Sequence, residues 1–444
     1  MRAVARAQRL ADKRLLMSYE RADGYVTIDA KVIASFAPGC IRLSALAVVH
    51  CSSEQTICSR HEGENDLSTQ FIFNEDQEQF RDNLARFLAD KSPTTEVRAQ
   101  MADARGYDPA VWSLLNQQLG LGGIAIAEQY GGAGFGPQEL AIACEEMGRS
   151  LYCGPYFASA VCAAHALSAT GGEVHKKQWL PRIASGDLIA CLAITERAPM
   201  WSDEDIQTTA TSSANGKYQL SGTKHYVIDA QVAGVVFVAA REVDGSVALF
   251  AADTAADGLT VTPVQSMDAT RKLNTVTLAN TPAERLGTAD LPSLMDYVVV
   301  ALSNEMVGGA QTLLQSALDY TQLRFQFGRS IASFQAIKHR LADLLLEVEL
   351  AKSAAYQAAY CLTVNEDVRE HASLAKAAAS EAYVHVASEC IQLHGGIGFT
   401  WENDTHLWFK RAKSSEVLFG TPAAHRERML QAITHGATAK ARIG

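Results

Sequence analysis

The stretch RFQFGRSIASFQ, residues 324–335, lies between two long segments whose apolar residues recur at helical spacing. It combines Arg324 and Arg329 with a glycine, aromatic residues and an amide. Arginine offers permanently charged, bidentate donors, and Gly328 lets the backbone come close to a ligand, so the loop could hold a phosphate group. Taken alone, however, it fits a helix-capping loop with surface arginines better than a binding site.

A second loop, QLHGGIGFT at residues 392–400, ends an alanine-rich segment with helical periodicity. Its paired glycines can cap that helix and leave backbone N–H groups exposed, and such groups bind anions. This loop also has a simpler interpretation, because a cap with His394 as a structural histidine would give the same pattern.

Outward from these loops, the period of the apolar residues divides the chain. From Asn74 onward the spacing is helical and the first turn is acidic, and helical spacing returns after Ser293. Between them the period is two, and an Asn215-Gly216 dipeptide predicts a hairpin turn. No helical segment separates these strands, which favours an antiparallel barrel or sandwich.

The predicted fold class is therefore α+β, with helical, β and helical domains in that order. The predicted boundaries are 66–190 for the first helical domain, 191–290 for the β domain and 291–444 for the last helical domain. Residues 1–65 show no clean period and are interpreted as an extension of unclear role.

Composition excludes several function classes. The chain has 444 residues, enough for about three domains, and a formal net charge of −10, which gives no positive field for nucleic acid or an anionic membrane. No run approaches the ~20 apolar residues that span a bilayer. Nine scattered cysteines without CxxC pairs argue against a disulfide scaffold or a zinc site, and fit a reducing cytoplasm. We expect no metal and a cytoplasmic location.

Residues 70 to 433 resemble the acyl-CoA dehydrogenase family of flavoproteins, because five motifs occur in the family's order. YGGAG at 130–134 resembles a loop of its helical domain, LAITE at 192–196 its flavin-contacting strand, and SGTKHYVI at 221–228 the next strand. The loops at 324–335 and 392–398 complete the set. The resemblance implies a helical domain, an antiparallel β domain and a C-terminal four-helix bundle, with FAD bound across a subunit interface.

The resemblance also implies which residues bind FAD. Around the isoalloxazine ring it places Leu192, Ile194, Thr195, Tyr226 and Ile228, with Ser202 near the flavin or the substrate. At the pyrophosphate and adenine end it places Arg324, Phe327 and Gln335 of one subunit and Gln392, Gly395 and Gly396 of another. Thr421, in the C-terminal motif, is a further candidate for cofactor binding.

The family's reaction needs a base as well as a flavin, because it removes an α-proton and a β-hydride from a thioester. A carboxylate with a raised pKa would serve. The motif that usually reads YEGT and carries this base reads LFGT at 418–421, so Phe419 stands at the base position and cannot accept a proton.

Some family members carry the base on the first long helix of the last domain, which here contains Glu305. Its sequence neighbours are apolar, which would raise the pKa of its carboxyl group. Counting from the motifs puts it about two helical turns, about 10 Å, beyond the position used in relatives. Glu305 is the candidate catalytic base, and a structural glutamate paired with an arginine is an equally good interpretation.

The resemblance implies an FAD-dependent α,β-dehydrogenase of acyl-CoA thioesters that passes electrons to an electron-transfer flavoprotein. The segments EMVGGAQ at 305–311 and FGTPAAHR at 419–426 resemble bacterial members that act on bulky, including steroid-derived, thioesters. Some of those pair unlike subunits of which only one carries the base. The expected assembly is a homotetramer or a mixed tetramer, and the alternative function is that of a partner subunit without a base.

Overall fold

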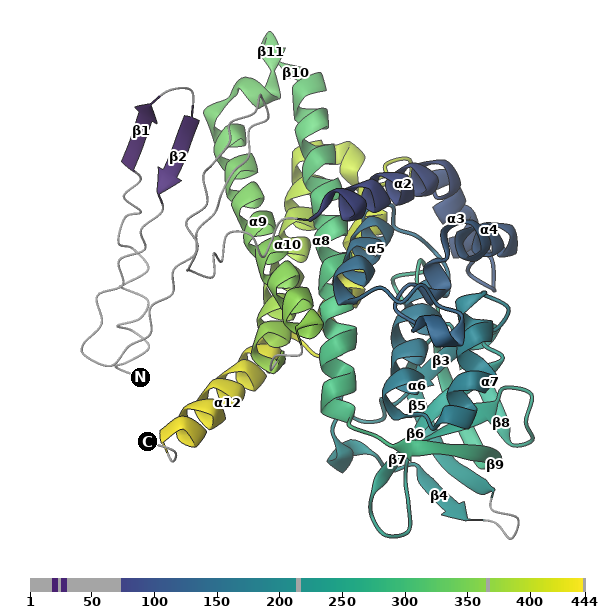
Figure 1. The fold of residues 1–444 in the computed structure, drawn as a ribbon. Coiled ribbons are helices and arrows are strands. Elements are labelled where there is room, and N and C mark those ends of the chain that lie inside the picture. Colours follow the sequence, from purple (N-terminus) through teal and green to yellow (C-terminus); the bar gives the residue numbers. More distant parts are fainter. Residues whose placement is uncertain (1–17, 23–24, 30–72, 213–216, 365–367, 442–444) are drawn as a thin grey trace. The chain divides into compact units, whose positions relative to one another are not determined.

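The computed structural model describes residues 18–22, 25–29, 73–212, 217–364 and 368–441, in two units of residues 1–65 and 66–444. In the first unit, β1 (Ser18–Ala22) pairs antiparallel with β2 (Tyr25–Asp29). The predicted Asn215-Gly216 turn and most of the predicted extension lie outside the described residues. The second unit has helices, then strands, then helices, which confirms the predicted order of the α+β fold (Figure 1).

The first helical domain begins at Asn74, as its acidic first turn predicted. The side chain of Asn74 accepts a hydrogen bond from Gln77 N at 2.8 Å, and the side chain of Gln77 accepts one from Asn74 N at 3.0 Å. This reciprocal capping box satisfies donors that the first helical turn leaves free. The helices of this domain are α2 (Glu75–Lys91), α3 (Thr94–Ala102), α4 (Pro109–Leu119), α5 (Pro137–Arg149), the π-helical η4 (Phe157–Ala163), α6 (Ala164–Thr170) and α7 (Glu173–Ala184).

The β domain is one sheet in the order β3-β6-β4-β5-β9-β7, which closes because β6 also pairs with β7. Most pairs are antiparallel, as expected, but β6 pairs in parallel with both β3 and β4. Parallel pairing needs a long connection, and the intervening chain supplies one in each case. The strands are β3 (Ala190–Ala193), β4 (Thr209–Ser212), β5 (Tyr218–Ile228), β6 (Val235–Arg241), β7 (Val247–Asp253), β8 (Leu259–Pro263) and β9 (Leu273–Thr288).

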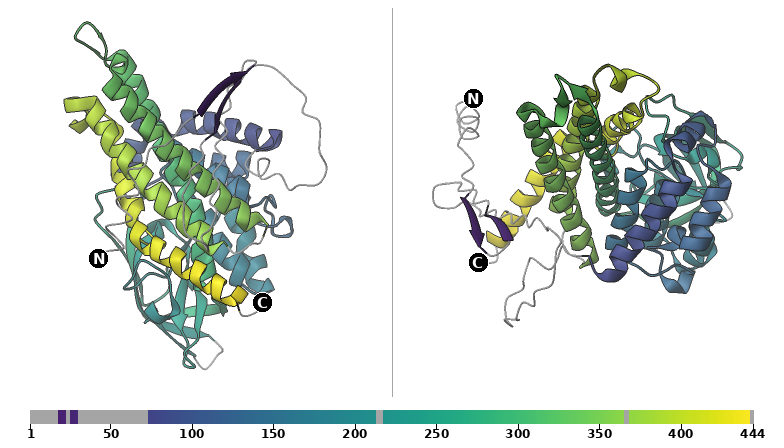
Figure 2. Two further views of the ribbon diagram at one scale, coloured as in Figure 1. Left: turned by 90° about the vertical axis from the view of Figure 1, so that its left-hand side faces the viewer. Right: turned by 90° about the horizontal axis from the view of Figure 1, so that it is seen from above.

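In the last domain, α8, α9 and α10 run side by side and α12 packs on α10 (Figures 1 and 2). Every residue of α8 from 294 to 310 is buried, so this helix passes through the centre of the unit. Among the described residues, no helix combines the length and the hydrophobicity that a membrane-spanning segment needs. The elements are α8 (Leu291–Leu323), β10 (Phe325–Gln326), β11 (Arg329–Ser330), α9 (Gln335–Thr363), α10 (Arg369–His394), the 3-10 helix η8 (Gly395–Phe399), α11 (Thr405–Val417) and α12 (Pro422–Ala441).

Two glycines let α5 and α8 come unusually close. A Cβ atom on Gly148 of α5 would clash with the backbone carbonyl of Glu305 on α8, and a Cβ atom on Gly308 of α8 would clash with the carbonyl of Glu145 on α5. Only glycine leaves room for this approach. The contact holds Glu305 at the boundary between the two helical domains.

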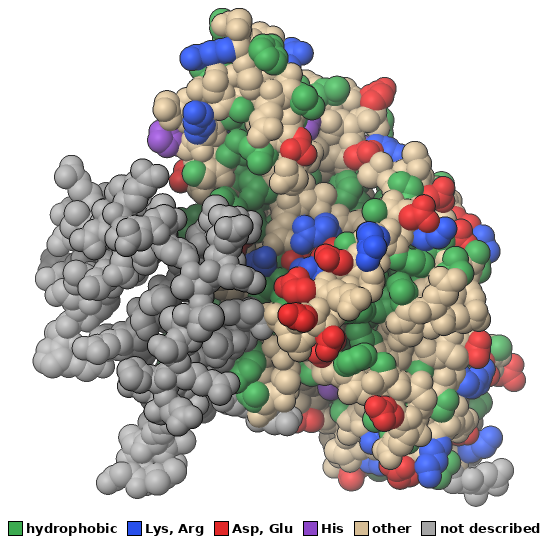
Figure 3. Space-filling model, turned by 45° about the horizontal axis from the view of Figure 1, so that its top comes forward, with side chains coloured by type: hydrophobic (Ala, Val, Ile, Leu, Met, Phe, Trp, Pro, Cys, Tyr) green, Lys and Arg blue, Asp and Glu red, His purple; other side chains and the backbone are tan. Residues whose placement is uncertain are grey.

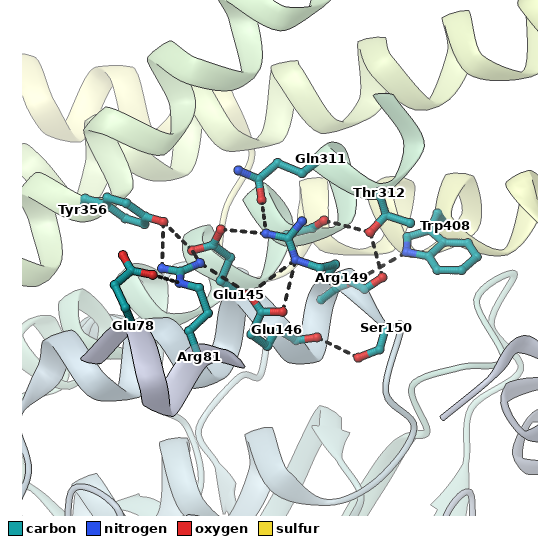
Figure 4. A network of polar contacts seen from close by, with 12 residues as sticks. Glu78, Arg81, Glu145, Glu146, Arg149, Ser150, Gln311, Thr312, Tyr356 and Trp408 are labelled. Atoms are coloured by element: carbon teal, nitrogen blue, oxygen red, sulfur yellow. Dashed lines mark hydrogen bonds and ion pairs between the residues drawn. The ribbon is translucent and has the colours of Figure 1, made fainter. Parts of the chain in front are cut away.

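A network of charged side chains joins the same helices (Figure 4). Arg81 of α2 pairs with Glu145 at 3.0 Å, and Tyr356 of α9 donates a hydrogen bond to Glu145 at 2.6 Å. Arg149 pairs with Glu145 at 3.2 Å and donates to Gln311 of α8 at 2.5 Å. Because Glu145 is fully buried, these partners are needed to offset the loss of its hydration. The network fixes the first helical domain on the last one.

Candidate active site

Residues from two separate motifs meet in one pocket at the ends of β3 and β5. The motif LAITE contributes Leu192, Ile194 and Thr195, and the motif SGTKHYVI contributes Tyr226 and Ile228. All five were predicted to surround the isoalloxazine ring. We call this the strand-end pocket; its lining is Ala158, Cys162, Leu192, Ile194, Thr195, Trp201, His225, Tyr226, Val227, Ile228 and Phe419.

An irregularity in β5 shapes this pocket. The register between β5 and β9 shifts between Lys224 and Val227, and Tyr226 has a positive φ of 56°. A non-glycine residue in this conformation is strained, and such strain gathers at functional sites. Tyr226 is 55% exposed and lines the pocket.

The loop after β3 is held by hydrogen bonds. His225 N donates to Thr195 O at 2.8 Å, and Trp201 Nε1 donates to the Thr195 hydroxyl at 3.0 Å. Trp201 therefore lines the pocket, whereas its neighbour Ser202 is not among the lining residues that the structure describes. The Ser202 hydroxyl instead donates to Asp205 at 2.7 Å, so its predicted place at the flavin remains a prediction.

A buried ion pair also holds the loop after β3 in place. Lys224 Nζ lies 2.6 Å from Glu196 Oε1 and also donates to Ile194 O at 3.2 Å. Burial lowers the pKa of Lys224 to about 8, although Glu196 opposes that shift. Burial acts to raise the pKa of Glu196, but Lys224 and the N–H group of Thr208 outweigh it, so that pKa lies below its usual value. Glu196 is a framework residue of the loop.

The predicted pyrophosphate and adenine residues are exposed at one end of the last domain. Arg324, Phe327 and Gln335 lie at the turn between α8 and α9, where Phe327 is 91% exposed and has a φ of 52°. Hydrophobic and basic side chains lie together over this tip (Figure 3). Arg324, Phe327 and Gln335 are not among the described residues that line the strand-end pocket.

The second predicted loop lies at the same end. Gln392, Gly395 and Gly396 are exposed after α10, and the ring of His394 stacks on that of Tyr320 near the end of α8, with centroids 4.3 Å apart. His394 Nδ1 lies 2.7 Å from Cys390 O. These contacts give His394 the structural role that the sequence left open.

The LFGT segment forms one wall of the strand-end pocket. Phe419 is buried with a φ of 59°, stacks on Phe157 with centroids 6.4 Å apart, and meets the edge of Trp201 at 5.1 Å. Thr421 is exposed and its hydroxyl accepts a hydrogen bond from Ala424 N at 3.3 Å, so it caps α12. Its cofactor role stays a prediction.

Glu305 lines a second cavity, behind Phe157. Both of its carboxylate oxygens are engaged: Arg271 Nη2 lies 2.5 and 2.6 Å from them, and Arg411 Nη1 lies 2.9 Å from Oε1. Asp268 completes the group by pairing with Arg411 at 3.1 Å. We call this second space the charged cavity; its lining is Cys144, Met147, Tyr152, Gly154, Tyr156, Phe157, Asp229, Thr270, Arg271, Glu305 and Arg411.

The expected pKa of Glu305 was wrong in direction. Burial acts to raise it, but Arg271 and Arg411 outweigh burial and hold the pKa below its usual value. The sequence indicated only the apolar neighbours along α8, while the two arginines come from the segment just before β9 and from α11. The pairing with arginine that the sequence offered as an alternative is present, and the role of Glu305 as a base remains a prediction.

Sequence reasoning missed a second carboxyl group in this cavity. Asp229 follows β5 directly, has a φ of 53°, and is buried. Burial raises its pKa to about 7, although Arg271 opposes the shift. An acidic residue directly after the apolar end of a strand in the SGTKHYVI motif was the available signal. A carboxyl group with this pKa is suited to general acid–base work near neutral pH.

Comparisons with known proteins agree with the predicted order of the helical and β domains. Three family models match in order: acyl-CoA dehydrogenase N-terminal domain at residues 74–187, middle domain at 191–280 and C-terminal domain at 296–434. The acyl-CoA dehydrogenase IpdE2 of Mycobacterium tuberculosis is 33% identical over 348 residues, which cover 78% of this chain and 94% of that protein. IpdE2 of Mycolicibacterium smegmatis is 30% identical, covering 80% and 98%.

Solved structures share the fold. A variant of the "Tcur3481-Tcur3483 steroid ACAD" has a TM-score of 0.75 and 29% identity, covering 82% of this chain and 99% of that one. A glutaryl-CoA dehydrogenase from Mycobacterium smegmatis in complex with FADH2 has a TM-score of 0.75 at 21% identity, covering 83% and 97%. The predicted family and fold are confirmed. The chain belongs to the acyl-CoA dehydrogenase family, FAD-dependent oxidoreductases that act on acyl-CoA thioesters.

Proposed function

We propose that this chain binds FAD with the isoalloxazine ring in the strand-end pocket and oxidises an acyl-CoA thioester between Cα and Cβ there. The observation that carries the proposal is the meeting of Leu192, Ile194, Thr195, Tyr226 and Ile228 in one pocket, although their motifs are about 30 residues apart. When bound, FAD supplies the acceptor for the β-hydrogen as hydride. The chain's own residues orient the ring and exclude water from it.

The donor set fits the rest of FAD when a second subunit is added. Arg324 supplies a guanidinium group, and a Cβ atom on Gly395 or Gly396 would meet no atom within 4 Å, so their backbone is open to a ligand. Exposed backbone N–H groups and arginine suit a pyrophosphate. These residues lie at the far end of the bundle, so we propose that they serve the pocket of a neighbouring subunit.

The proposed assembly is a homotetramer or a mixed tetramer with another family member. Leu345, Leu346 and Leu350 of α9 are each about half exposed, and Phe325 and Phe327 stand out at the tip. An apolar surface of this kind is typical of a subunit interface. Electron-transfer flavoprotein is the proposed electron acceptor, and a cytoplasmic location is proposed with it.

We propose bulky acyl groups, including steroid-derived ones, as the substrate class. The 29% identity to a solved steroid ACAD supports this choice, as does the resemblance of the segments at 305–311 and 419–426 to enzymes for such thioesters.

Two carboxyl groups of the charged cavity are candidates for removing the α-proton. Glu305 is the candidate from the sequence, and its cavity adjoins the strand-end pocket across Phe157 and Phe419. The pKa of Asp229, which is about 7, favours this residue as the base, because a base works best when its pKa is near the working pH.

A second candidate function is that of a partner subunit that lacks a base. One observation favours it: both oxygens of Glu305 already accept hydrogen bonds from arginines, and Phe419 has no group that accepts a proton. In this case the chain would supply cofactor contacts and interface to another subunit.

One experiment separates these possibilities. Acyl-CoA thioesters of increasing bulk are added without oxygen to purified, FAD-loaded protein, and the loss of flavin absorbance is followed in the wild type, Glu305→Gln and Asp229→Asn. FAD content is measured on the same samples. Loss of bleaching in one variant with FAD retained identifies the base. A wild type that holds FAD and is bleached by no thioester contradicts the dehydrogenase proposal and leaves the partner-subunit function.

A further inference from the structure

The charged cavity contains a hydrogen-bond donor with no acceptor. Arg271 uses Nη2 for both oxygens of Glu305, and its guanidinium group lies over the ring of Phe157, 5.1 Å from the centroid. Its other terminal nitrogen, Nη1, is buried and has no hydrogen-bond partner among the described residues. Arg271 as a whole is only 6% exposed. Buried donors are rarely left unpaired, because they lose their bonds to water without replacement.

The charged cavity lies beside the strand-end pocket. Phe157 lines the charged cavity, while Ala158, its neighbour on η4, lines the strand-end pocket. The stacked rings of Phe157 and Phe419 stand between the two spaces. An acyl group with its reacting carbons in the strand-end pocket would therefore meet Arg271 once it extends past Phe157.

The charges already present decide which kind of acceptor fits. The guanidinium groups of Arg271 and Arg411 face the carboxylates of Glu305 and Asp268, so the cluster is balanced before any ligand enters. Asp229 adds a further acidic group to the same lining. A carboxylate on the ligand would add an unbalanced negative charge in a dry space, which is strongly unfavourable. A neutral oxygen could accept from Arg271 without this penalty.

The size of the cavity agrees with a small group. The centre of a water-sized group can move within only about 20 Å³ of it, which leaves room for about one such group. A hydroxyl or a carbonyl oxygen is of that size.

We propose that the charged cavity receives a neutral oxygen, a hydroxyl or a ketone, carried on the acyl part of the substrate beyond Cβ, and that Arg271 Nη1 donates the hydrogen bond that selects it. Arg271 is thus a specificity-determining residue. The inference rests on the proposed function, since it assumes that an acyl-CoA thioester occupies the strand-end pocket. It adds the substrate class: oxygenated acyl groups are preferred over plain ones.

The test compares matched CoA thioesters by calorimetric binding to the purified protein. One series carries plain alkyl or cycloalkyl acyl groups. The second carries one hydroxyl or keto oxygen at successive carbons beyond Cβ, and the third carries a terminal carboxylate. We expect at least about tenfold tighter binding for the oxygenated thioester at one position of the second series, and no such gain for the carboxylates.

The variants Arg271→Met and Arg271→Lys identify the donor. Both should abolish the gain, because lysine keeps the charge that pairs with Glu305 but not the planar second donor. Because Arg271→Lys keeps this charge, it is the variant less prone to misfold. Thermal unfolding and FAD content show whether either variant has misfolded. Arg285→Met is the control, since Arg285 pairs with Glu242 on the β domain away from both spaces, and it should keep the gain.

The outcomes are distinct. If plain thioesters bind and no position of oxygen improves binding, the donor is satisfied by water and this inference is wrong while the dehydrogenase proposal stands. A gain that survives in Arg271→Lys, or a carboxylate that binds more tightly than the hydroxyl, also overturns it. If no thioester binds at all, the proposed function fails as well.

Discussion

A single nitrogen of Arg271 contacts both carboxylate oxygens of Glu305: Nη2 lies 2.5 Å from Oε1 and 2.6 Å from Oε2. Both side chains are more than nine-tenths buried. The pair joins the segment just before β9 to the middle of α8, and Arg411 extends it to α11.

Glu305→Gln should destabilise the protein strongly. Removing the carboxylate leaves two buried guanidinium groups without their counter-charge, and breaking a buried pair from one side costs about 3–5 kcal/mol. Thermal and denaturant unfolding would measure the loss. The matched control is Glu242→Gln, which breaks the more exposed pair with Arg285 and should cost about 1 kcal/mol or less. Equal effects of the two variants would contradict the buried role of Glu305.

Asp229→Asn should change how stability depends on pH. The pKa of Asp229 is raised from 3.8 to about 7, so between these values the folded protein holds a proton that the unfolded chain has released. The contribution of Asp229 to the free energy of unfolding therefore falls as the pH rises toward 7. Above pH 7 the ionised group destabilises the folded protein. Since one pKa unit is about 1.4 kcal/mol, this destabilisation is at most about 4 kcal/mol.

The measurement is the unfolding temperature of wild type and Asp229→Asn at pH 5 and pH 8.5. We expect the unfolding temperature of Asp229→Asn to increase relative to that of the wild type as the pH rises. A difference between the two proteins that does not change with pH would show that Asp229 has an ordinary pKa.

Lys224→Met should weaken FAD binding as well as stability. It leaves Glu196 buried without its partner and removes the hydrogen bond to Ile194 O, so the loop that carries Thr195 loses its support. The double variant Lys224→Met with Glu196→Gln should recover part of the stability, because the unpaired charge is gone. FAD titration and thermal unfolding of the three proteins test this. A double variant no better than the single one would disagree with the ion-pair explanation.

Two glycines should behave in opposite ways. Gly308→Ala should destabilise the fold by about 2 kcal/mol or more, because the new methyl group would clash with the carbonyl of Glu145 and force α5 and α8 apart. Gly396→Ala meets no atom within 4 Å and should leave the unfolding temperature of the isolated chain unchanged. If Gly396 approaches the pyrophosphate of a neighbouring subunit, this second variant should still reduce FAD content. Unchanged FAD content in Gly396→Ala would remove Gly396 from the cofactor site.

The order of the domains and five of the residues that line the strand-end pocket could be predicted from the sequence. Helical and strand periods are local signals, so they predicted helices from Asn74, strands after residue 190 and helices after Ser293. Motif resemblance predicted Leu192, Thr195 and Tyr226 as neighbours, because short motifs at the ends of strands keep their place in a family's fold.

The surroundings of Glu305 depend on the tertiary fold and could not be predicted from the sequence. Its neighbours along α8 are apolar, which suggested a raised pKa, but a charge acts through space and not along the chain. Arg271 and Arg411 are 34 and 106 residues away in sequence and within 3 Å in the fold. The burial of Asp229 and the unpaired Nη1 of Arg271 could not be predicted from the sequence either, because both depend on which elements pack around the side chain.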